Sequence, residues 1–100
     1  MFVHHVYFWL KAGSPADAGE NLVHDCRTIL GRIPGVEQLW AGTPAGTSRE
    51  VVDNSYAVGL AVIFKDSSAH DVYQKHELHL EFIERNKGFW ERVRVFDFNG

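Results

Sequence analysis

The chain has 100 residues, 45% of them apolar and 23% charged, which suits one globular domain that folds without disulfides. A formal net charge of −3 with no basic run excludes a nucleic-acid-binding surface, and the single cysteine, Cys26, excludes a disulfide and a cysteine-rich zinc site. Nothing in residues 1–11 resembles a signal peptide, and no apolar run approaches the ~20 residues of a membrane span, so we expect a single cytoplasmic domain over residues 1–100.

The first predicted element is a strand over residues 2–10, FVHHVYFWL, because its side chains are apolar on both alternating faces. One face carries Phe2, His4, Val6, Phe8 and Leu10. The other carries Val3, His5, Tyr7 and Trp9. A strand of this kind is typical of the centre of a sheet.

A helix is predicted next, with Ser14 as its N-cap and Pro15 at its first position. Its apolar stripe recurs at helical spacing: Leu22, Val23, Cys26, Ile29, Leu30 and Ile33. Pro34 and Gly35 end the helix. Because Cys26 lies on the stripe, we interpret it as a core residue and not a nucleophile.

Two strands and a loop follow. Residues 36–42, VEQLWAG, predict the second strand, and residues 43–55 form the only long loop. Residues 56–64, YAVGLAVIF, predict the third strand, with a large face from Tyr56 to Phe64 and a small face of Ala57, Gly59 and Ala61. The small face is expected to let a helix lie close to the sheet.

The last third of the chain predicts a broken helix and a closing strand. Asp66 and the serines after it cap a short helix, a second helical segment starts near His76, and Gly88 ends it. Residues 90–98, WERVRVFDF, read as the fourth strand. The order βαββαβ predicts an α+β, ferredoxin-like fold, with a four-stranded antiparallel sheet and its helices on one face.

Helices on one face leave the other face of such a sheet uncovered. That face is expected to expose Tyr7, Trp9, Val58 and Leu60. A patch of this size is typical of an interface, so the pattern predicts a homodimer that packs sheet to sheet as a dimeric α/β barrel.

Several segments together resemble the stress-responsive A/B barrel (Dabb) family. They are HHVYFWLK, IPGVEQLWAG, YAVGLAVIFKDSSAHDVYQKHELH and FWERVRVFDF, which cover nearly the whole chain apart from residues 43–55. The resemblance implies a ferredoxin-like protomer and a homodimer. Most members of the family have no established activity.

One plant member, olivetolic acid cyclase, closes a polyketide ring without a cofactor. The resemblance places its catalytic histidine and tyrosine on His79 and Tyr73, and a pocket histidine of its first strand on His5. Trp90 matches an aromatic residue of the same pocket, whereas a further pocket histidine falls on Val58. The last difference removes one polar group from the implied site.

The stretch YQKHELHLEF allows three interpretations of His76 and His79. A metal site formed by the two histidines would lack the further ligands that zinc requires, so no metal and no cofactor is predicted. As an acid–base site, His79 would be the base and Tyr73 the hydrogen-bond donor, with His5 facing the same cavity. In the third interpretation His76 has only a structural role and would end a helix. This interpretation is favoured for His76. His24 and His70 are expected on solvated helix faces.

We therefore expect His79, Tyr73 and His5 as catalytic residues of a cavity between sheet and helices. Its expected lining is Tyr7, Trp9, Val58, Leu60, His76 and Trp90. The predicted function is a cofactor-free lyase or cyclase that acts on a small apolar or carbonyl-containing compound. The alternatives are a non-catalytic small-molecule-binding or stress-associated module and, from fold analogy alone, a cofactor-free monooxygenase.

Overall fold

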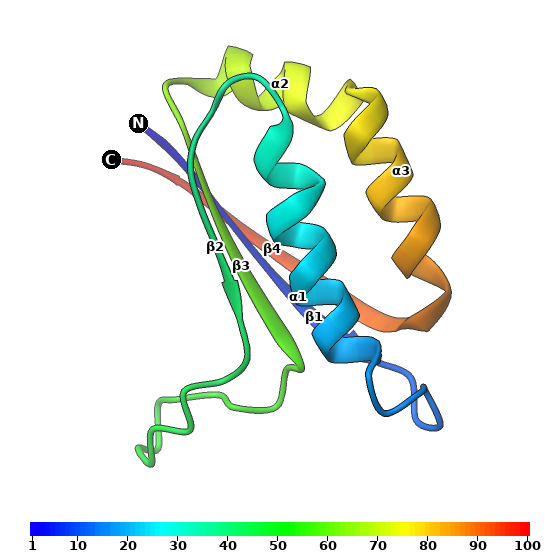
Figure 1. The fold of residues 1–100 in the computed structure, drawn as a ribbon. Coiled ribbons are helices and arrows are strands. Elements are labelled where there is room, and N and C mark those ends of the chain that lie inside the picture. The colour runs from blue at the N-terminus through cyan, green and yellow to red at the C-terminus, as the bar shows by residue number, and fades with distance from the viewer.

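The computed structural model describes all of residues 1–100, and every helix lies on the same face of one four-stranded sheet (Figure 1). The sheet is antiparallel throughout, with strand order β2-β3-β1-β4. The elements are β1 (Phe2–Leu10), α1 (Ala18–Thr28), η1 (Leu30–Arg32), β2 (Val36–Gly42), β3 (Val58–Phe64), α2 (Ser67–Lys75), α3 (Glu77–Asn86), η2 (Lys87–Phe89) and β4 (Trp90–Asn99). The predicted α+β, ferredoxin-like fold class is confirmed.

The central strands β1 and β3 send one set of side chains beneath the helices. Their register pairs Val6 with Leu60 and Phe8 with Val58. Cross-strand partners lie on one face of a sheet, so these side chains enter the core together, and none is more than 7% exposed. The full core is Val6, Phe8, Leu22, Cys26, Ile29, Leu30, Ile33, Ala41, Val58, Leu60, Val62, Phe64, Tyr73 and Phe82.

The structure contradicts the predicted orientation of the third strand. Val58 and Leu60, expected on the uncovered face, are 0% and 4% exposed beneath the helices. The small residues occupy the open face instead: a Cβ added to Gly59 would lie 3.4 Å from ring carbons of both Tyr7 and Tyr56. Period-two alternation separates two faces without saying which one is covered. Covering the larger side chains removes more apolar area from water, and that decides the choice.

The open face of the sheet carries an aromatic layer. Its members are Tyr7, Trp9, Trp40, Tyr56, Phe96 and Phe98. The ring centroids of Tyr7 and Tyr56 lie 5.0 Å apart, and Trp40 and Phe98 are more than half exposed. Uncovered rings in this number are typical of a protein–protein contact.

The start of α1 differs from the prediction. The helix begins at Ala18 and not at Pro15, because the Ser14 hydroxyl donates to the Lys11 carbonyl, 2.7 Å away, and closes a turn of its own. The predicted apolar stripe is buried except for the half-buried Val23, and burial raises the pKa of Cys26 to about 12. Cys26 is therefore a core residue, as predicted.

A buried carboxylate joins α1 to α3. Asp25 accepts hydrogen bonds from Arg85 at 3.0 and 3.3 Å and from the Asn86 amide at 3.0 Å. Burial alone would raise the pKa of Asp25, but these two donors outweigh it and hold the pKa below its usual value. The contact fixes α3, which carries His79, against α1.

The three α-helices have 11, 9 and 10 residues, and each is amphipathic. None combines the length and the apolar character that crossing a membrane requires.

Candidate functional site

A cavity of about 190 Å³ lies between the sheet and the helices α2 and α3. Ten of its thirteen lining residues are hydrophobic. The lining is His4, Val6, Phe8, Leu30, Leu60, Tyr73, Gln74, His79, Phe82, Ile83, Trp90, Val93 and Val95. An apolar cavity with a few polar groups is the usual form of a small-molecule site.

The break between α2 and α3 brings Tyr73 and His79 together at this cavity. Their ring centroids are 4.8 Å apart, in an edge-to-face arrangement. The break occurs at His76, whose extended backbone (φ −67°, ψ 145°) ends α2 and starts α3. Tyr73 at the end of one helix and His79 at the start of the next therefore face one space.

His76 itself has a structural role. Its backbone N–H donates to the Tyr73 carbonyl, and its Nδ1 accepts the N–H of Leu78 at 3.1 Å. His76 is thus the N-cap of α3, which agrees with the structural role predicted for it at a helix end. It does not line the cavity, so its predicted lining role is wrong.

We expect His76→Ala to lower the free energy of unfolding by about 0.5–2 kcal/mol, because the N–H of Leu78 loses its acceptor. The matched variant His76→Asn keeps a capping oxygen and should lose less. Chemical denaturation of the three proteins checks this. Equal losses in both variants would show that the cap contributes little.

Two buried polar atoms at the cavity have no hydrogen-bond partner. They are the Nδ1 of His79 and the indole Nε1 of Trp90. Buried polar atoms are almost always paired in proteins, because an unpaired one costs about 1–3 kcal/mol. Both atoms belong to side chains that line the apolar cavity, which makes them its unpaired polar groups.

Burial keeps the side chains of His79 and Tyr73 uncharged. Burial, and then the neighbouring His4 and His70, lower the pKa of His79, so its imidazole is neutral at physiological pH. Burial raises the pKa of Tyr73, which therefore stays protonated and able to donate. A neutral imidazole beside a hydrogen-bond donor is suited to proton transfer.

The predicted position of His5 is wrong, and His4 takes its place. His5 lies on the open face, where its ring contacts Tyr7 and Phe98 at centroid distances of 6.3 and 5.7 Å. The His4 ring, 5% exposed, lies 6.0 Å from Tyr73 beneath the helices. Alternation on β1 places His4 with Val6, and that grouping was the signal that could have identified it.

His4 belongs to a second polar group at the same end of the sheet. Its Nδ1 lies 2.6 Å from an Oδ1 of Asp97, and its ring centroid lies 4.5 Å from that of His70. His70 is 6% exposed, so the prediction that it is solvated is wrong, whereas His24 is exposed as expected. The face of α2 that carries His70 packs on Phe2, which helical spacing alone does not reveal.

The remaining predicted lining residues divide between the two faces. Leu60 and Trp90 line the cavity as predicted, but Val58 is buried in the core outside its lining. Tyr7 and Trp9 lie on the open face, so their predicted place in the cavity is wrong.

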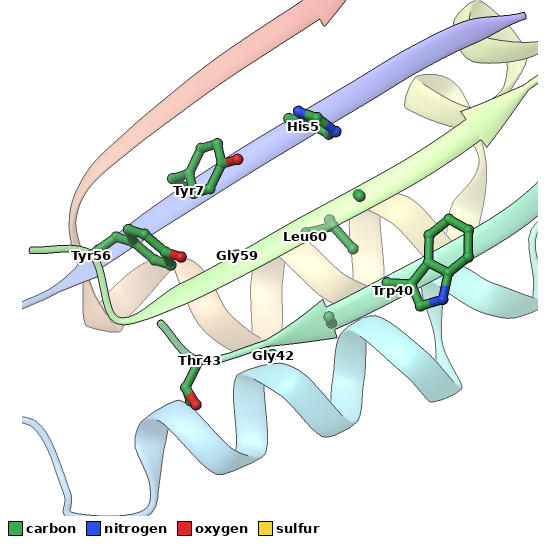
Figure 2. Close-up of a pocket in the computed structure, with 10 residues that line it drawn as sticks. His5, Tyr7, Trp40, Gly42, Thr43, Tyr56, Gly59 and Leu60 are labelled. Carbon is green, nitrogen blue, oxygen red and sulfur yellow. The ribbon is translucent and has the colours of Figure 1, made fainter. Parts of the chain in front are cut away.

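A hollow of about 340 Å³ lies on the open face of the sheet. Figure 2 shows His5 and Tyr7 on β1 and Trp40 on β2 among the residues that line it. Tyr7 also lines an adjacent hollow with Trp9 and Arg94. Neither hollow contains Tyr73 or His79, so His5 cannot act together with them within one protomer.

The family model of the stress responsive A/B barrel domain matches residues 2–100. The chain belongs to this family. No curated protein sequence matches the chain.

Three solved structures illustrate what the protein is similar to. The protein At3g17210 of Arabidopsis thaliana is 21% identical, with 100% of this chain and 95% of that one covered and a TM-score of 0.84. A dimeric ferredoxin-like protein of unknown function from Thermobifida fusca is 14% identical, with 99% and 90% covered and a TM-score of 0.83. The hydroxynitrile lyase of Passiflora edulis is 15% identical, with 97% and 90% covered and a TM-score of 0.81. At these identities the likeness shows the fold alone.

Proposed function

We propose that this protein is a cofactor-free lyase or cyclase that uses His79 as a general base on a small carbonyl compound. The observation that carries the proposal is the unpartnered Nδ1 of His79 at an apolar cavity. In the tautomer protonated on Nε2, Nδ1 has a free lone pair, and the lowered pKa of His79 keeps it free at neutral pH. The known activity of a similar fold, a hydroxynitrile lyase, is chemistry of this class.

Trp90 and Tyr73 supply hydrogen-bond donors for the carbonyl oxygen of the substrate. The Trp90 Nε1–H is buried without an acceptor, and an indole N–H can only donate. A carbonyl oxygen in the cavity would accept this hydrogen bond and gain negative charge as His79 removes a proton from the neighbouring carbon. The enolate carbon formed in this way can attack a second carbonyl carbon, whose oxygen takes up the proton that His79 removed. The reverse sequence cleaves the same carbon–carbon bond.

The size of the cavity limits the ligand. A protein cavity of about 150 Å³ holds a benzene molecule. About 190 Å³, filled to the density of a protein interior, therefore holds one aromatic ring with about four further heavy atoms. A compound of the size of phenylacetone fits this limit.

The experiment uses two probes of this size. Exchange of the α-protons of phenylacetone in D₂O, followed by NMR, reports proton abstraction. Release of benzaldehyde from its cyanohydrin reports lyase activity, in which the hydroxyl loses its proton, the bond to cyanide breaks and cyanide leaves with the electron pair. The proposal expects rates above the buffer background for at least one probe.

The principal alternative is a binding module without chemistry, supported by the predominantly apolar lining of the cavity. It predicts saturable binding of phenylacetone with no exchange above background. If the probes neither bind nor react, the cavity is not a site for small carbonyl compounds, and both proposals fail.

The monooxygenase alternative is supported only by a likeness of fold. The similar structure is that of a Nitrosomonas europaea protein, which is provisionally described as an antibiotic biosynthesis monooxygenase.

The pH dependence follows from the neighbours of His79. A general base works unprotonated, so kcat/KM should be level at neutral pH and fall on acidification, with an apparent pKa below the ordinary histidine value of 6.5. The titratable groups around His79 are Tyr73 and His70 from α2 and His4 from β1, and the two histidines act in the same direction as burial. A pH–rate profile checks this, and a rate that rises on acidification would contradict the role of His79.

We also propose that the protein forms a homodimer through the open face of the sheet. The aromatic layer is the supporting feature, together with the dimeric state of the similar T. fusca protein. Covering the layer with a second copy about a twofold axis would close a barrel-like dimer. Stable interfaces of this kind bury on the order of 2,000 Å² or more.

A further inference from the structure

A cluster of three potential metal ligands lies where β1 and β4 pass beneath α2. The groups are His4 from β1, His70 from α2 and Asp97 from β4, and one ligand atom of each lies within 4.8 Å of the others. His4 also lines the cavity of the proposed catalytic site, whereas His79 and Trp90, the unpartnered groups of that site, are not in the cluster. The prediction of no metal concerned a site built on His76 and His79, and the structure assembles a different set.

The fold holds these side chains together for identifiable reasons. His4 and Asp97 are register partners in the β1–β4 ladder, so both project from the helix-covered face. The ring of His70 stacks on Phe2 at a centroid distance of 4.5 Å and lies 4.5 Å from the ring of His4. The two imidazoles are 5% and 6% exposed and are therefore fixed before any ligand arrives.

We propose that His4, His70 and Asp97 bind a divalent transition-metal ion of the zinc type. Two imidazoles and one carboxylate form a donor set that zinc prefers, and three protein ligands leave a fourth position for water. The Asp97 side chain is 34% exposed, which gives the ion a route from solvent. The Gln74 side-chain amide lies 3.2 Å from Nε2 of His70. With the amide turned so that its oxygen faces this nitrogen, it accepts the Nε2–H of a His70 that binds the ion through Nδ1, which is the outer contact that orients a metal-bound histidine.

The adjustments that the ion requires are small. Ligand atoms about 2.0–2.1 Å from a tetrahedral zinc ion lie roughly 3.3 Å from each other. The His4–Asp97 contact, 2.6 Å, must lengthen by less than about 1 Å, and the widest separation, below 4.8 Å, must shorten by about 1.5 Å at most. Rotation of the partly exposed Asp97 side chain contributes to both changes. The ion then replaces the His4–Asp97 hydrogen bond with two metal–ligand bonds.

The test uses the full chain without a histidine tag, stripped of metal with a chelator. Titration calorimetry with ZnCl₂ gives stoichiometry and affinity, and the visible absorption of added Co²⁺ reports tetrahedral coordination. We expect one ion per chain, and a loss of at least ~100-fold in affinity in His70→Gln and in Asp97→Asn. The exposed residue His24 provides the matched control, because His24→Gln should bind as the unmodified chain does.

Each other outcome overturns the proposal. No stoichiometric binding removes the site, and an equal loss in His24→Gln and His70→Gln identifies surface binding. Loss of binding in His76→Gln with retention in Asp97→Asn would move the ion to the pair in YQKHELHLEF. Asp97 lies on an edge strand and is partly exposed, so Asp97→Asn keeps the test decisive if His70→Gln fails to fold.

Discussion

Replacing His79 by glutamine is expected to lower turnover of a reactive probe by ~10²–10⁴-fold, the usual effect of removing a general base. The amide side chain fills nearly the same space as the imidazole but cannot take up a proton at neutral pH. The imidazole donates no structural hydrogen bond through Nδ1, so the fold should lose little stability. Initial rates of α-proton exchange and of cyanohydrin cleavage, with thermal unfolding on the same samples, check this.

Two further variants make the result specific. His24→Gln changes an exposed histidine of α1 and should keep full activity. Tyr73→Phe keeps the ring that packs against His79 and removes only a donor, so it should lose less activity than His79→Gln. If His79→Gln retains activity while it still binds phenylacetone, His79 is not the base. The stretch YQKHELHLEF then has only a structural role at the helix break, and the base is another residue.

Replacing Leu60 by aspartate is expected to unfold the protein. Leu60 is 4% exposed between the sheet and the helices, with Val6 as its cross-strand partner. A carboxylate there would be buried without a cation, which costs several kcal/mol against the ~5–15 kcal/mol of a typical domain. Loss of the cooperative transition in circular dichroism, or recovery only as aggregate, checks this.

Its neighbour Ala61 gives the opposite test. Ala61 faces the open side of the sheet, between His5 and Trp40 in the ladders, so Ala61→Asp should leave the protomer folded. In a sheet-to-sheet dimer the new carboxylate would be buried twice about the twofold axis. Sedimentation should therefore show a folded monomer for Ala61→Asp and a dimer for the unmodified chain. A monomeric unmodified chain at micromolar concentration would contradict the dimer, and a dimeric Ala61→Asp would place the interface elsewhere.

Local patterns were sufficient for the type and order of the strands and α-helices, although α1 and β3 begin later than predicted, at Ala18 and Val58. The bounds predicted for β1 and β2 agree with the structure, because residues 2–10 alternate and Gly35, with φ +96°, ends the preceding segment. Asp66 caps α2 by accepting the N–H of Ala69, as its position before a helical pattern indicates. The break at His76 was visible for the same reason, since it depends on a few adjacent residues.

The candidate site was predictable only in part. The pairing of Tyr73 with His79 depends on one helix break and came from the sequence with the family resemblance. The histidine that joins them did not, because His4 and His5 differ only in the face of β1 that they occupy.

The sequence by itself thus determined the order of strands and helices, the broken helix and the presence of two alternating faces on each central strand. Only the tertiary structure decided which face the helices cover, and therefore that Leu60 is core, that His4 and not His5 meets Tyr73, and that His70 is buried. It also brought Asp97 to His4, across 93 positions of the chain. The physical reason is that periodicity is a property of neighbouring residues, whereas the covered face is set by the total apolar area that distant segments bury against one another.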